Sequence, residues 1–168
     1  MGLTRPGVVA FAFGVPGTIL SNRRIAQIAE KLAKDLKAPI YTQRDVWIAD
    51  LLKVKVEYTP EVIGKPPPTF RIVRGAIEWA TRENLNELWV VAATPRLPRV
   101  LRDFSWAIDE FHDINIRVAE EMGFVPEEVW YSPDSRQKRT RSARDWQRAE
   151  RVLNYLPPFL YKFIALHW

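Results

Sequence analysis

The chain has 168 residues, of which 47% are hydrophobic, and this is enough for one domain with its own core. It contains no cysteine and only two histidines, which excludes a disulfide framework, a thiolate zinc site and a cysteine nucleophile, and disfavours a histidine-rich metal site. The formal net charge of +5 favours anionic partners such as nucleotides, nucleic acid or lipid headgroups, although solubility alone explains it equally well.

The N-terminal apolar run, residues 8–13, is too short for the hydrophobic part of a signal peptide. No stretch reaches the roughly 18 apolar residues that a membrane span requires. We therefore expect a cytoplasmic protein with no transmembrane segment.

The first part of the chain alternates strand and helix patterns. Residues 7–13 form a continuous apolar run that ends at the sequence GVPG, which is typical of a buried strand followed by a tight loop. Ser21 and Asn22 are candidate caps for a helix, because apolar residues recur at helical spacing over residues 25–36. Residues 40–42 then predict a second, short strand.

The next segment is less regular. Residues 46–52 favour a short helix, and the alternation over residues 53–58 predicts a third strand near a sheet edge. Residues 59–68 contain four prolines and one glycine, so we predict a loop there.

The strand and helix patterns then repeat. A helix is predicted over residues 69–83, and residues 88–93 form the clearest buried strand of the chain. A strongly amphipathic helix is predicted over residues 97–111, followed by a strand over residues 115–118. Residues 127–131 favour one more short strand.

Strands that alternate with helices of about 12 to 15 residues predict right-handed βαβ units. We therefore predict a three-layer, Rossmann-like α/β domain over residues 1–131, with a mostly parallel sheet and helices on both faces. Residues 132–168 are predicted to form a basic helical extension packed on the same domain. Ligands of such sheets bind outside the carboxyl ends of the strands, which here lie near Gly14, Thr42 and Thr94.

The loop after the first strand is the first candidate for ligand contacts. It lies where Rossmann folds hold phosphate, so Gly14, Val15 and Asn22 are candidate ligand-binding residues. The sequence GVPG is not the GxGxxG fingerprint, and Pro16 removes one amide donor. A tight turn without a ligand is the alternative.

The second candidate is the polar loop after the second strand. Thr42 and Gln43 are predicted to make polar contacts with a ligand, and Asp45 is the candidate catalytic base. The alternative for Asp45 is a cap of the following segment.

The third candidate is the sequence TPRLPR after the strand over residues 88–93. Thr94, Arg96 and Arg99, with Arg102 one turn later, form a candidate anion clamp, because the planar guanidinium matches carboxylate or phosphate. The alternative is a network of surface salt bridges.

The fourth candidate is the basic stretch Arg136–Arg151, which contains seven lysines or arginines and two acids. With Trp146, it could bind a nucleic-acid backbone, so a nucleic-acid-binding or scaffolding module is the alternative function. A helix is predicted over residues 144–155, and a solvated helix face is the simpler interpretation of its charges. Peripheral membrane attachment through residues 146–168 is a third interpretation.

At these loops the chain resembles the YdcF/SanA/ElyC-like family, a Rossmann-like family of largely unknown function, over about Val8–Phe111. The similar segments are VVAFAFGVP, IYTQRD, Thr69 and the strand LWVVA. Relatives carry Thr-Ser-x-x-His-x-x-Arg after that strand, and Arg99 matches the final Arg, whereas Ala93 and Arg96 replace the Ser and the His. The resemblance implies a pocket at these loops for a small anionic or nucleotide-like ligand, with a nucleotide or S-adenosylmethionine as cofactor. It adds Thr69 to the ligand-binding candidates and leaves catalysis open.

Overall fold

Parallel strands form the centre of the molecule. The computed structural model describes residues 4–49, 53–61, 66–108 and 113–167, and within these ranges five strands pair in the order β3-β2-β1-β4-β5. All neighbouring pairs are parallel, which confirms the predicted α/β class. The strands are β1 (Pro6–Phe11), β2 (Ile40–Thr42), β3 (Val56–Tyr58), β4 (Glu87–Ala92) and β5 (Asn115–Val118).

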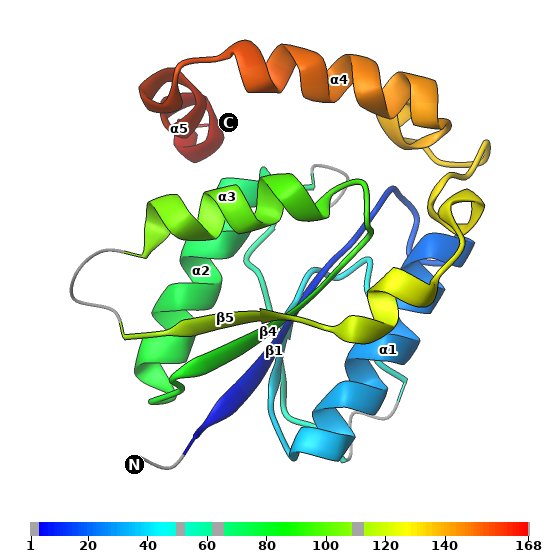
Figure 1. The fold of residues 1–168 in the computed structure, drawn as a ribbon. Helices are drawn as coiled ribbons and strands as arrows, with labels where there is room; N and C mark the ends of the chain where they lie inside the picture. Colours follow the sequence, from blue (N-terminus) through cyan, green and yellow to red (C-terminus); the bar gives the residue numbers. More distant parts are fainter. Residues whose placement is uncertain (1–3, 50–52, 62–65, 109–112, 168) are drawn as a thin grey trace.

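Helices cover both faces of this sheet, as predicted (Figure 1). Alternate residues of β1 point to opposite faces, so Val8 packs with α1 (Leu20–Leu36), and Val9 packs with α2 (Thr69–Arg82) and α3 (Leu97–Ala107). Because both faces are covered, the central strands are continuously apolar.

The C-terminal segment lies across the carboxyl end of the sheet (Figure 1). Helix α4 (Ala143–Tyr155) begins after Ser142, whose Oγ accepts a hydrogen bond from the amide of Asp145. Helix α5 (Pro158–His167) packs its residues Tyr161 and Ala165 against Phe70 of α2. Three 3-10 turns lead to α4: η1 (Glu120–Phe124), η2 (Glu127–Trp130) and η3 (Lys138–Thr140).

Two predicted elements are wrong. Residues 46–49 form no helix. They are an irregular segment from which Val46 and Ile48 pack into the core. Residues 50–52 of this prediction lie outside the described ranges. The predicted strand over residues 127–131 is the turn η2, closed by a hydrogen bond from the amide of Val129 to the carbonyl of Pro126.

The remaining elements agree with the prediction apart from their ends. The predicted strand over residues 7–13 ends at Phe11, because side chains take the next two amides. The helix predicted to reach residue 111 ends at Ala107, and residues 109–112 lie outside the described ranges. Within the described ranges, no helix has both the length and the hydropathy to cross a membrane.

Gly75 allows α2 to lie close to β2, so Gly75→Ala should destabilise the fold. A Cβ there would collide with Oη of Tyr41, which is buried against Trp79. We expect a loss of about 1–3 kcal/mol from overpacking, which exceeds the roughly 1 kcal/mol that alanine gains over glycine in a helix. Urea unfolding followed by circular dichroism measures this change.

Tyr41→Phe provides the matching control. Alone it sets the baseline, and combined with Gly75→Ala it should restore most of the lost stability, since it removes the oxygen that collides. A double variant as unstable as the sum of the two single changes would contradict this explanation.

Candidate functional site

The loop after β1 is held by buried amide side chains. Asn22 Oδ1 accepts the amide of Phe13 at 2.8 Å, and Asn22 Nδ2 donates to the carbonyl of Gly14 at 3.0 Å. Gln43 Oε1 accepts the amide of Ala12 at 3.0 Å. Asn22 and Gln43 were both predicted to contact a ligand. Their side-chain amides instead bond to the backbone of residues 12–14, which no longer pairs with a neighbouring strand.

The predicted caps of α1 are wrong. The helix begins at Leu20 after Ile19, so Ser21 lies within its first turn and Ser21 Oγ donates backward to the carbonyl of Phe13 at 2.8 Å. Asn22, in the same turn, also bonds to the preceding loop.

Gly14 and Val15 contact the C-terminal segment. Gly14 has a φ of +97°, and a Cβ there would lie 2.8 Å from Ser135 Oγ. The amide of Val15 donates to Ser135 Oγ at 3.3 Å, and its carbonyl accepts from the amide of Arg136 at 2.8 Å. The predicted phosphate loop is thus a docking site for residues 135–140.

Thr42, Asp45 and Thr94 make other contacts. Thr42 Oγ1 is buried and donates to the carbonyl of Ala10 at 3.0 Å. Asp45 is half-buried, and burial raises the pKa of its carboxyl, although a hydrogen bond from the amide of Gly17 opposes the shift. Thr94 is exposed and lines a separate, open hollow of about 670 Å³ beside α4.

Arg96 is buried where β1, α2 and α3 meet. Its exposed fraction is 6%, and its guanidinium donates to the carbonyl of Ala12 through Nη1 and to Thr69 Oγ1 through Nη2, the latter at 3.1 Å. Its Nε is buried without a hydrogen-bond partner among the described residues. The charge of Arg96 therefore contacts neutral groups.

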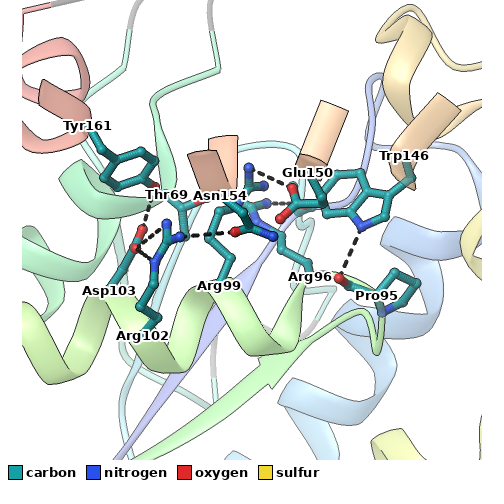
Figure 2. Close-up of polar contacts among 11 residues, drawn as sticks. Thr69, Pro95, Arg96, Arg99, Arg102, Asp103, Trp146, Glu150, Asn154 and Tyr161 are labelled. Carbon is teal, nitrogen blue, oxygen red and sulfur yellow. Dashed lines mark hydrogen bonds and ion pairs between the residues drawn. The ribbon is translucent and has the colours of Figure 1, made fainter. Parts of the chain in front are cut away.

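Arg99 is equally buried, one turn further along α3. Its exposed fraction is 5%, and its guanidinium lies over the ring of Trp146 at 5.1 Å. Arg99 Nη1 forms an ion pair with Glu150 Oε1 at 2.9 Å, and Trp146 Nε1 donates to the carbonyl of Pro95 at 3.0 Å (Figure 2). Two side chains of α4 thus hold this arginine.

A second polar group joins α3 to α5. Asp103 is fully buried, and its two oxygens accept from Arg102 Nη2 at 3.1 Å and from Tyr161 Oη at 2.7 Å (Figure 2). Burial raises the pKa of the Asp103 carboxyl, while the hydrogen bond from Tyr161 and the charge of Arg102 oppose that shift. Asp103 is therefore the common acceptor of hydrogen bonds from Arg102 and Tyr161.

A cavity of about 350 Å³ lies between the start of α2, α3 and the two C-terminal helices. Its polar lining consists of Thr69, Arg99, Arg139 and Tyr161. The rest of its lining is apolar and comes mainly from α4 and α5: Pro66, Pro68, Leu153, Leu156, Ile164 and Ala165.

The positive charges around this cavity repel one another. Burial, together with the charges of Arg99 and Arg139, lowers the pKa of Arg96 to about 9. Burial, followed by the charge of Arg99, also lowers the pKa of Arg139. Over the ranges that the structure describes, Glu150 is the one carboxylate within ion-pair distance of these three guanidiniums.

Three predicted residues therefore lie together at this cavity. Thr69 and Arg99 line it. Arg96 is not part of the lining but donates a hydrogen bond to Thr69. Arg139 and Tyr161 also line the cavity, although neither was predicted as a residue of this site. The basic stretch was a signal for Arg139, whereas no spacing pattern singles out Tyr161.

Tyr161→Phe should weaken the docking of α5. The change removes the hydrogen bond to the buried Asp103 carboxylate, and hydrogen bonds to charged groups contribute about 1.5–3 kcal/mol. Urea unfolding should show a loss in this range, and limited proteolysis should cleave the C-terminal segment faster. Tyr155→Phe, at an exposed tyrosine of α4, is the matched control. Equal stability of the two variants would contradict the assignment.

Comparisons of this chain with family models, with curated proteins and with solved structures find no match. The function of the cavity is therefore inferred from the side chains that form it.

Proposed function

We propose that the protein binds a small molecule with a phosphate or carboxylate group in the cavity between α2, α3 and the C-terminal helices. The anion would contact Arg99, Arg139 and Thr69, with Arg96 behind them. The observation that carries this proposal is an excess of positive charge: the buried guanidiniums of Arg96 and Arg99 and the half-buried guanidinium of Arg139 have one carboxylate, that of Glu150, within ion-pair distance among the described residues.

The cost of burying charge supports an anionic ligand. Removing a guanidinium from water costs several kcal/mol unless a nearby opposite charge offsets the loss. The guanidinium of Arg96 donates hydrogen bonds to a carbonyl and a hydroxyl, both neutral, and Glu150 forms its ion pair with Arg99. A bound anion would supply the missing charge, and a guanidinium binds carboxylate or phosphate more strongly than it binds neutral acceptors.

The start of α2 adds a second attraction for an anion. Pro68 and Thr69 line the cavity at the N-terminus of this 14-residue helix, where backbone amides and the helix dipole favour negative charge. Thr69 Oγ1 accepts from Arg96, so its own hydroxyl proton can point to a ligand oxygen.

The apolar wall restricts the rest of the ligand. Leu153, Leu156 and Ile164 line the same cavity as Arg99 and Arg139, which favours a ligand with an apolar or aromatic part beside its anion. A nucleotide-like molecule has this combination. Asp45, the predicted base, is not part of the described lining, so we propose binding at this cavity and no catalytic step.

Ligand binding can be tested by thermal unfolding. We expect inorganic phosphate, adenosine monophosphate or S-adenosylmethionine to raise the melting temperature relative to chloride at equal ionic strength. A ligand present at one hundred times its Kd stabilises the folded state by about 2.7 kcal/mol. If no probe shifts the wild-type protein, the proposal fails.

Arg139→Gln separates the cavity from general basicity. This change should abolish the ligand-dependent shift while raising the melting temperature of the ligand-free protein, because it removes a charge that Arg99 and Arg96 repel. Lys138→Gln, at the exposed neighbouring position, is the matched control and should behave like the wild type. A ligand shift of wild-type size in Arg139→Gln would contradict the assigned site.

A further inference from the structure

The net positive charge of the chain comes from its C-terminal segment. Residues 132–168 contain eight lysines or arginines and three acids, whereas residues 1–131 contain seventeen of each sign. The whole excess of +5 therefore belongs to the segment that lies across one end of the molecule (Figure 1).

Exposed apolar side chains gather on the same segment. Within the described ranges, six of the ten exposed large hydrophobic residues belong to α4 and α5. Tyr155, Phe159 and Phe163 are the most exposed aromatic members, at 84%, 75% and 59%. The other three are Val152, Leu160 and Leu166.

Helix α4 separates its buried side from a basic and apolar outer side. Trp146, Glu150 and Leu153 face the rest of the protein. The opposite side carries three exposed arginines at helical spacing, followed by two exposed apolar residues: Arg144, Arg148, Arg151, Val152 and Tyr155.

Helix α5 also has an exposed apolar side. Phe159, Phe163 and Leu166 recur at helical spacing, while Tyr161 and Ala165 are buried against α2. Both helices lie outermost at their end of the molecule (Figure 1), so their exposed sides face away from the domain. We call these exposed sides of α4 and α5 the outer face.

We infer that the outer face docks on an anionic lipid bilayer. The apolar side chains would enter the boundary between headgroups and acyl chains, and the three arginines would bind lipid phosphates. The binding of an amphipathic helix to a membrane surface grows with the buried apolar area and with the attraction to anionic lipids, and the outer face provides both.

The composition of the outer face favours a bilayer over other partners. A nucleic acid would contact the arginines and leave Val152, Leu160 and Leu166 in water. A second copy of the chain would bring two segments of charge +5 together, and their repulsion opposes pairing. An anionic bilayer satisfies the charge and covers the apolar side chains at the same time.

Vesicle flotation of the full chain tests this inference. We expect binding to vesicles of equal parts phosphatidylcholine and phosphatidylglycerol, and much weaker binding to phosphatidylcholine alone. Replacing Arg144, Arg148 and Arg151 with glutamine should reduce binding about a hundredfold at low salt, since each arginine near an anionic surface contributes about fivefold. Phe159→Ser with Phe163→Ser should weaken binding at every salt concentration, because apolar insertion is not screened.

Matched variants at other exposed positions control for surface composition. Trp47→Ser with Phe124→Ser, and glutamine at Arg23, Arg24 and Arg71, should bind like the wild type. Failure of the wild type to bind the anionic vesicles would overturn the inference, as would equal losses in the control variants. Binding of an RNA oligonucleotide without vesicle binding would overturn it in favour of a nucleic-acid surface.

Size-exclusion chromatography with light scattering tests self-association. A dimer in solution that dissociates in the variant carrying Phe159→Ser and Phe163→Ser would overturn the inference of membrane docking.

Vesicle binding does not require the arginine cavity. Arg139→Gln should therefore float like the wild type even where it loses its ligand-dependent shift, so the two proposals fail independently.

Discussion

The buried guanidinium of Arg96 is the contact on which the carboxyl end of the sheet depends. Arg96 follows β4 directly, yet it bonds to Ala12 after β1 and to Thr69 at the start of α2. One side chain thereby fixes the relative positions of three elements. Burying this charge away from water lowers the stability of the folded protein unless the surrounding groups compensate for the lost hydration.

The C-terminal segment provides only part of that compensation. It shields the arginines from water and supplies Glu150 to Arg99, but it also adds Arg139 beside them. Tyr161 donates a hydrogen bond to Asp103, whose carboxylate also accepts one from Arg102. Because the segment adds one negative and one positive charge beside these arginines, it leaves a region of positive potential next to an apolar wall, where we propose that an anion binds.

Much of the fold could be predicted because its signals are local. Continuous apolar runs identified β1 and β4, and helical spacing identified α1, α2 and α3. Val46 and Ile48 misled the prediction, because two apolar residues that are two positions apart fit an inward-facing extended segment as well as a helix. Asn22 and Gln43 lie where ligand-binding residues are expected, but their amides hold backbone groups that β1 leaves unpaired.

The site was predictable only where strand ends determine it. That rule pointed to Arg96 and Arg99, and a family resemblance added Thr69. Arg139 and Tyr161 reach the same cavity from positions far along the chain, through packing that no periodicity encodes. Basic composition also could not distinguish the half-buried Arg139 from the exposed arginines of α4, because burial follows from tertiary contacts.

The late position of the C-terminal segment in the chain affects how the cavity is assembled during synthesis. All five described strands lie before residue 119, so the sheet can form on the ribosome before α4 and α5 have emerged. Until then the contacts of Arg99 with Trp146 and Glu150 cannot form. The cavity is complete only once residues 135–140 have docked on the Gly14 loop and Tyr161 on Asp103, because α4 and α5 supply part of its lining. If an anion binds there as proposed, the completion of the cavity is the step at which that anion affects the folding of this protein.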